Sequence, residues 1–233
     1  MAAELVRPVE SRANLTKMVY AALLLIATSG AFFVLFTDYS MQLVATNRFS
    51  LARTVEEDFS PAQSCFALLQ LLILLVVFNP HISQMFSFRG VPRIAGNILL
   101  GISAGVIALS ATLPSFLGSQ ASGNALFLAN HFYSMSGLGL AVLLVFLLPI
   151  TAEIVFRGIF LRELLQNISA VSAVIVSTLL FVLSWPAFNL IAGAALGLVA
   201  GILFYRTRSV LACVVANATF TVGAIVFQIS RLR

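Results

Sequence analysis

Long apolar segments recur along this sequence and constrain its fold more than any other feature. A helix that crosses the ~30 Å hydrocarbon core of a membrane needs about 20 residues of this kind. The segments also lack the apolar and polar alternation of membrane barrel strands. We therefore predict an all-α, polytopic membrane bundle of about seven transmembrane helices, near residues 17–37, 62–79, 94–117, 134–156, 169–185, 187–205 and 209–229.

The composition excludes other broad classes of protein. Of 233 residues, 61% are hydrophobic and 9% are charged, and the mean hydropathy is +1.06. A water-soluble domain does not have these values. Nucleic-acid binding is also excluded, because it needs a soluble basic surface. The net charge of +5 instead reflects membrane topology, with some affinity for anionic lipid.

The basic residues predict how the chain is oriented. Cytoplasmic segments of membrane proteins carry an excess of Lys and Arg. With the N-terminus inside, nine of the thirteen fall on the inner side, namely Arg7, Arg12, Lys17, Arg89, Arg93, Arg157, Arg162, Arg206 and Arg208. We therefore expect the N-terminus inside and the C-terminus outside. As a separate expectation, we assign this multi-pass protein to the bacterial inner membrane.

We predict that residues 1–233 form a single integral membrane domain. Residues 1–16 form a cytoplasmic arm, 17–130 the N-terminal helices and 134–229 the C-terminal core. The first apolar segment is too long for the apolar region of a signal peptide, so we expect an uncleaved helix. Glycines spaced four residues apart predict close helix contacts in two spans, at Gly101, Gly105, Gly193, Gly197 and Gly201.

An acidic and a basic residue stand close together in the fourth span. Glu153 is the only acidic residue inside a long apolar segment, and Arg157 follows four positions later. This spacing places both on one helix face. Because a charge at membrane depth is costly, such groups pair, face the bundle interior and often mark a site. Pro149 removes a helical hydrogen bond, so we expect a kink just before the pair.

Other ionisable residues give weaker indications. His81 lies at a predicted membrane boundary and His131 in a predicted outer loop. A solvated or capping histidine is the ordinary interpretation, and ligation of a bound pigment or contact with a lipid is the alternative. The two cysteines lie in predicted spans and offer no metal-binding spacing. We predict no metal site and no cofactor.

Three short motifs follow in order from the fourth span to the seventh. They read Ala152-Glu153-Ile-Val-Phe-Arg157-Gly, Phe181-Val-Leu-Ser-Trp185 and Asn217-Ala-Thr-Phe-Thr221, and Tyr205-Arg206-Thr207-Arg-Ser209 precedes the third. Their order and spacing resemble the Glu-Glu-x-x-x-Arg, Phe-x-x-x-His and His-x-x-x-Asn/Asp motifs of the CAAX-protease and bacteriocin-processing (CPBP, or Abi) family. That family of intramembrane proteases includes the type II CAAX prenyl endopeptidases. The resemblance implies a CPBP-like helical core.

The resemblance also assigns chemistry to particular positions. In the family the first Glu and the first His are thought to activate water, with or without a metal, while the Arg and second His assist at the oxyanion. Other residues occupy four of the motif positions here, namely Ala152, Trp185, Asn217 and Thr221. Alanine and tryptophan cannot act as the general base that water activation needs. The sequence therefore predicts a catalytically inactive member with a degenerate site.

Without catalysis, we expect an accessory or scaffold subunit that binds other integral membrane proteins and lipids within a larger membrane assembly. The alternative is an active intramembrane peptidase with a rearranged site centred on Glu153 and Arg157. A transporter is disfavoured because the spans show no repeated halves.

Overall fold

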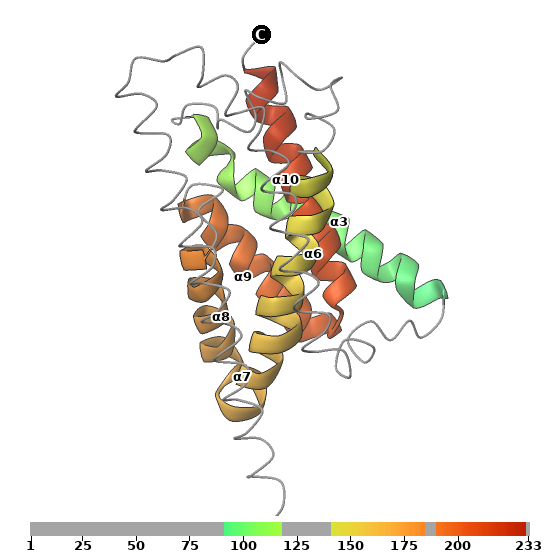
Figure 1. Ribbon diagram of the computed structural model, residues 1–233, viewed down its shortest axis with the longest axis vertical. Coiled ribbons are helices and arrows are strands. Elements are labelled where there is room, and N and C mark those ends of the chain that lie inside the picture. Colours follow the sequence, from blue (N-terminus) through green and yellow to red (C-terminus); the bar gives the residue numbers. More distant parts are fainter. Residues whose placement is uncertain (1–90, 118–140, 185–189, 232–233) are drawn as a thin grey trace, which may run out of the picture. The chain divides into compact units, whose positions relative to one another are not determined.

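The structure is a computed structural model that describes residues 91–117, 141–184 and 190–231. All of these belong to one compact unit, Arg53–Arg233. Every regular element among them is a helix, as predicted (Figure 1). Two of these helices are π-helices, named η1 and η2. The elements are α3 (Val91–Leu117), η1 (Leu143–Leu147), α6 (Leu148–Glu153), η2 (Ile154–Leu161), α7 (Arg162–Asn167), α8 (Ala170–Ser184), α9 (Leu190–Thr207) and α10 (Val210–Ser230).

Four helical segments of the described chain are long and apolar enough to cross a membrane. They are Ile94–Leu117, Leu144–Asn167, Leu190–Thr207 and Val210–Ser230, and Ala170–Leu183 is a shorter apolar helix. The protein is thus an integral membrane protein with a helical fold. The predicted arm 1–16 and the spans 17–37 and 62–79 lie outside the described residues, so the total of about seven helices stays a prediction.

The fourth predicted span ends later than expected. The sequence placed its end near residue 156, but η1, α6, η2 and α7 follow one another without interruption to Asn167. Arg157 therefore lies within the candidate span Leu144–Asn167 and is fully buried. The difference arises because a charge that pairs within a bundle can remain at membrane depth.

Pro149 affects the same segment. It lies in the first turn of α6, immediately after the π-helix η1. A π-helix bonds each amide to the carbonyl five residues earlier, which changes the hydrogen-bond register of the helix. Pro149 thus lies where the helix changes from π to α geometry, and the kink expected there stays a prediction. Thr151 Oγ1 adds a hydrogen bond of 2.7 Å to the Leu147 carbonyl across this turn.

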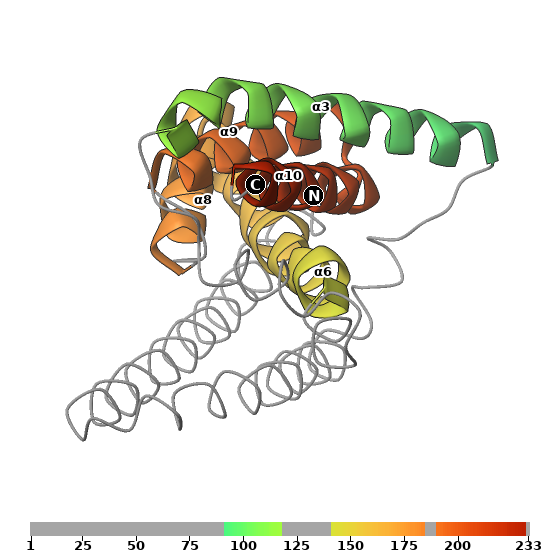
Figure 2. The ribbon, with the colours of Figure 1, turned by 90° about the horizontal axis from the view of Figure 1, so that it is seen from above.

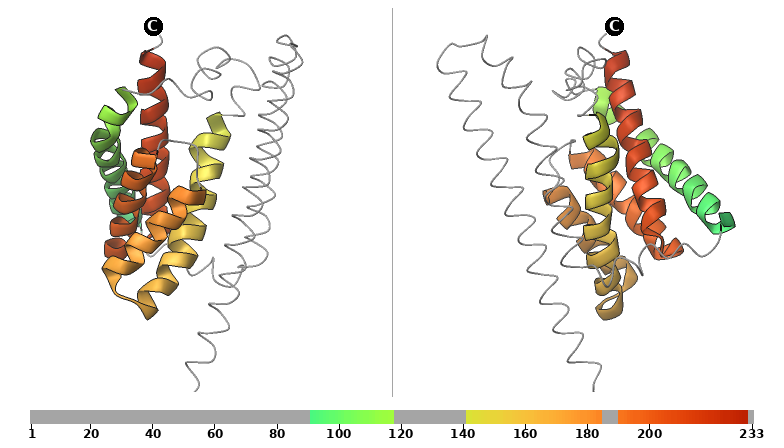
Figure 3. Two further views of the ribbon diagram at one scale, coloured as in Figure 1. Left: turned by 90° about the vertical axis from the view of Figure 1, so that its left-hand side faces the viewer. Right: turned by 45° about the vertical axis from the view of Figure 1, so that its right-hand side comes forward.

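Helix α10 packs against most of the other described elements. It contacts α3, α9, α6 and both π-helices, whereas α8 packs against α9 and η2 (Figures 2 and 3). The segment that carries Glu153 and Arg157 packs against α8, α9 and α10.

Glycine permits the close contact between α3 and α10. A Cβ atom at Gly101 would lie 2.6 Å from the Ala212 carbonyl oxygen, and one at Gly105 would lie 2.5 Å from that of Ala216. Real side chains do not approach backbone oxygens so closely, so both positions require glycine. The structure confirms the predicted close packing at this Gly-x-x-x-Gly pair.

The second glycine series faces α8. Cβ atoms at Gly197 and Gly201 would lie 2.8 Å from Thr178 Cγ2 and 2.9 Å from Val174 Cγ1. The predicted smooth face of α9 is thus confirmed, and it brings the α9 backbone close to the buried charged pair.

Polar groups at the helix ends fix α10 in place. The Ser209 side chain accepts a hydrogen bond from the Ala212 amide at the N-terminus of α10. At the other end, the Arg231 guanidinium donates to the carbonyls of Phe116 and Leu117, the last residues of α3. One side chain therefore supplies donors to carbonyls that a helix C-terminus leaves without intrahelical partners.

Candidate functional site

The predicted pair of Glu153 and Arg157 forms a buried ion pair. Glu153 ends α6 and Arg157 lies in η2, and both side chains are 0% exposed. Arg157 Nε lies 3.2 Å from Glu153 Oε2, and Arg157 Nη1 donates to Glu153 Oε1 at 3.2 Å. Burial inside a membrane bundle makes each charge depend on the other for compensation.

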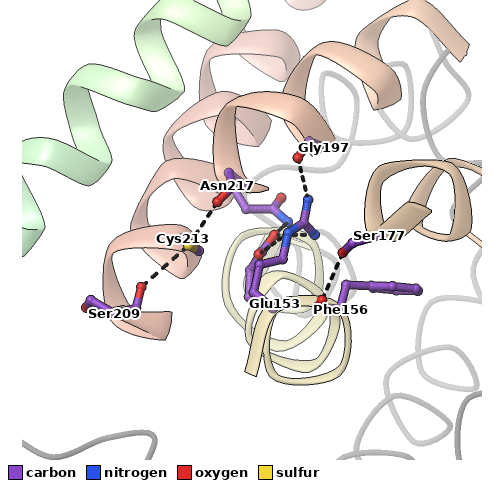
Figure 4. Close-up of polar contacts among 9 residues, drawn as sticks. Glu153, Phe156, Ser177, Gly197, Ser209, Cys213 and Asn217 are labelled. Carbon is purple, nitrogen blue, oxygen red and sulfur yellow. Dashed lines mark hydrogen bonds and ion pairs between the residues drawn. The ribbon is translucent and has the colours of Figure 1, made fainter. Parts of the chain in front are cut away.

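Helix α10 contributes a polar group to the same carboxylate. Asn217 Nδ2 donates to Glu153 Oε1 at 2.8 Å, a contact drawn in Figure 4. Thr221 Oγ1 lies 3.5 Å from Asn217 Oδ1, within its own helix. Asn217 therefore forms a hydrogen bond across the bundle, from α10 to the end of α6. Among the described residues, the Thr221 hydroxyl bonds to Asn217, which lies one turn away on the same face of α10.

The Arg157 guanidinium also binds α9 and α8. Its Nη2 donates to the Gly197 carbonyl oxygen at 3.1 Å, and its Cζ lies 4.4 Å from the centroid of the Phe181 ring. The ring face attracts the cation. Phe181 in turn meets the Phe156 ring edge to face, with 5.5 Å between centroids. The pair therefore joins four helical segments through one buried network.

The structure describes five of the six motif residues identified from the sequence. Ala152, Glu153, Arg157, Asn217 and Thr221 are all buried, and the last four are linked by the contacts given above. Ala152 lies beside Glu153 in α6 and contributes only a methyl group. Trp185 lies outside the described residues, as do His81 and His131, so their predicted roles stay predictions.

Two further polar residues belong to this region and were not identified from the sequence. Cys213, one turn before Asn217 on α10, donates its thiol hydrogen toward the carbonyls of Ala200 and Ser209, each at 3.4 Å. Ser177 of α8 donates to the Phe156 carbonyl at 2.9 Å. Small polar residues inside apolar helices give no distinctive sequence pattern, because most of them bond their own helix.

The chemistry open to this arrangement is limited. Within residues 91–117, 141–184 and 190–231, no three His, Cys, Asp or Glu side chains gather closely enough to hold a metal ion. Both oxygens of the Glu153 carboxylate contact cations or donors. A general base must instead lie within reach of the water that it deprotonates.

Comparison with known proteins places this network inside a recognised family segment. Residues 123–223 match the family model described as type II CAAX prenyl endopeptidase Rce1-like. The match includes all three motifs and ends two residues after Thr221. Comparisons with curated proteins and with solved structures give no match. The helical membrane architecture and the motif positions agree with this assignment, and the chain therefore carries, at residues 123–223, a domain of the Rce1-like type II CAAX prenyl endopeptidase family.

Proposed function

We propose that this chain is a catalytically inactive family member that serves as an accessory or scaffold subunit, binding other integral membrane proteins within a larger membrane complex. One observation carries the proposal. The Glu153 carboxylate, the acidic group retained from the first motif, is 0% exposed and already engaged by Arg157 and Asn217. A carboxylate held in this way acts as a structural counter-ion.

The neighbouring positions support the same interpretation. Ala152 stands where the family has its first Glu, and its side chain is 2% exposed and closely packed. A methyl group cannot accept a proton from water, and close packing leaves little room for a substrate carbonyl beside it. Ala152 thus contributes to packing and cannot take part in water activation.

Metal-assisted hydrolysis is also disfavoured by the donors that remain. A catalytic zinc site normally has three protein ligands from His, Cys or carboxylate groups. Here the Asn217 amide turns a donor toward Glu153, and the positive Arg157 guanidinium lies 3.2 Å from the same carboxylate. A divalent cation would have to displace both groups.

A scaffold role agrees with the surface of the described helices. Large apolar side chains project outward from α8, where Val171 is 71% and Leu183 is 76% exposed. Such a surface suits lipid or the helices of a partner protein. The glycine contacts and the buried network hold the helices that carry this surface in close contact with one another.

Co-purification tests the scaffold role. The tagged full-length chain is extracted from its native membrane with a gentle detergent, and the proteins that accompany it are quantified by mass spectrometry. We expect a defined set of integral membrane proteins at a constant ratio to the chain. If the folded chain migrates alone, with no accompanying protein at a comparable amount, the scaffold role is excluded.

The second candidate function is an intramembrane peptidase with a rearranged site. The observation in its favour is that Glu153 and Arg157 remain together in a domain whose family name denotes prenyl endopeptidases. Its substrates would be peptides with a prenylated C-terminal segment. Cleavage of such a peptide by the purified chain, with loss of cleavage in Glu153→Gln, would establish it.

A further inference from the structure

The π-helix η2 is unusually long for its type. It runs over eight residues, Ile154–Leu161, whereas most π-helical segments are single turns, many of them at functional sites. Arg157 lies in the middle of this segment and is fully buried. The geometry of η2 therefore determines where the guanidinium is placed.

A hydroxyl group from another helix bonds the backbone of η2. Ser177 Oγ of α8 donates to the Phe156 carbonyl at 2.9 Å, and Ser177 is 1% exposed (Figure 4). Serines inside helices usually donate to the carbonyl four residues earlier in their own helix. Ser103 and Ser110 of α3 follow that rule, at 2.9 and 2.8 Å. Ser177 instead directs its hydrogen bond toward the residue that immediately precedes Arg157.

The same face of α8 also holds the guanidinium. Phe181 lies one helical turn after Ser177, and its ring contacts both Arg157 and Phe156. An α-helix turns by about 100° per residue, and a π-helix turns by less because each hydrogen bond spans one more residue. If residues 154–161 adopted α geometry, Arg157 would rotate away from Phe181 and from the Gly197 carbonyl.

We propose that Ser177 is a positioning residue that holds residues 154–161 in π-helical geometry through its hydrogen bond to Phe156, and so directs Arg157 to Gly197 of α9. The hydroxyl donates a hydrogen bond to a buried backbone carbonyl of the underwound segment, and the loss of a hydrogen bond from a buried polar group costs free energy. This role goes beyond the proposed function. It holds whether the network is purely structural or catalytic.

Thr178 offers a matched control at the next position of α8. It is 5% exposed, and its hydroxyl has no hydrogen-bond partner in the described part of the chain. Thr178→Val removes this hydroxyl at nearly constant volume. Ser177→Ala removes the hydroxyl that is bonded to η2. Both changes delete one buried oxygen atom from one helix, and only the second is expected to alter η2.

The experiment compares these variants as full-length chains in lipid nanodiscs, in two measurements. Amide hydrogen exchange reports on residues 154–161, and ¹⁵N NMR of labelled arginine side chains reports on Arg157, whose signal is identified by its loss in Arg157→Lys. For Ser177→Ala we expect exchange at least tenfold faster over 154–161 and a displaced Arg157 signal. For Thr178→Val we expect wild-type values in both measurements.

Two results would overturn the proposal. The first is a folded Ser177→Ala chain with wild-type exchange in η2 and an unmoved Arg157 signal. The second concerns the unaltered protein and remains decisive if the serine variant does not fold. Solid-state NMR with labelled phenylalanine carbonyls and serine Cβ atoms must give a correlation between Phe156 and Ser177, and its absence would refute the contact.

Discussion

Removing the Glu153 carboxylate is the most informative perturbation of the buried network. The carboxylate has contacts of 3.2, 3.2 and 2.8 Å with Arg157 Nε, Arg157 Nη1 and Asn217 Nδ2. In Glu153→Ala all three are lost, and within the described part of the chain the guanidinium keeps the Gly197 carbonyl and the Phe181 ring. Both charges are fully buried, so solvent does not compensate for the loss.

The expected cost follows from this burial. Deleting one partner of a buried pair costs ~3–5 kcal/mol, a large part of the roughly 5–15 kcal/mol by which folded proteins are stable. Replacing both partners with apolar groups of similar volume is often neutral or stabilising. We therefore expect Glu153→Ala and Arg157→Met each to be strongly destabilised. The double variant Glu153→Leu/Arg157→Met should unfold near or above the wild-type temperature.

Cys213 provides the assay. Its thiol is fully buried on α10, close to the network, so a fluorogenic maleimide reports unfolding when the thiol becomes accessible. The measurement uses a Cys65→Ser background to remove the other cysteine of the chain. Unchanged unfolding of Glu153→Ala would refute the structural role of the pair. A double variant that unfolds at a lower temperature than either single variant would refute the argument from uncompensated charge.

Three further predictions, which use four substitutions, test contacts between the described helices. Gly105→Ala should lower the unfolding temperature despite the better helix propensity of alanine. Gly96→Ala, where nothing lies within 4 Å of the added Cβ, should leave the unfolding temperature equal or higher. If both variants lowered the unfolding temperature by the same amount, the close-contact argument would be contradicted. Asn217→Asp should destabilise the chain, because it places a second carboxylate beside Glu153. The unfolding temperature above pH 7 measures this loss of stability, and a higher unfolding temperature than wild type would count against the described contact. Arg231→Ala should speed amide exchange in the last turn of α3, where its guanidinium donates to two carbonyls, and unchanged exchange would exclude that capping role.

The sequence was sufficient to predict the helical class, the close contacts at glycine and the charged pair. These features depend on local periodicity and on the cost of charge in a membrane, which a single segment reveals. Hydropathy located α8, α9 and α10 to within a few residues. It ended the fourth helical segment at about residue 156, whereas the helix continues to Asn167, since the charge of Arg157 is paired inside the bundle and does not end the helix.

Other parts of the site depend on contacts between distant residues. The acceptor for Arg157 is a backbone carbonyl at Gly197, which no side-chain pattern indicates. The π-helical geometry of residues 154–161 likewise depends on a neighbouring helix, because the apolar sequence there fits an α-helix equally well. Such features arise from tertiary packing, so the sequence alone did not predict them.

Peptide cleavage tests the central claim, that a protease-family core persists here as a structural scaffold. The purified full-length chain in lipid is incubated with a synthetic peptide that ends in a CAAX motif, a prenylated cysteine followed by three residues, and products are identified by mass spectrometry. The account predicts no released tripeptide from either the wild-type chain or folded Glu153→Gln. Release of the tripeptide by the wild-type chain, and its loss in Glu153→Gln, would contradict the account.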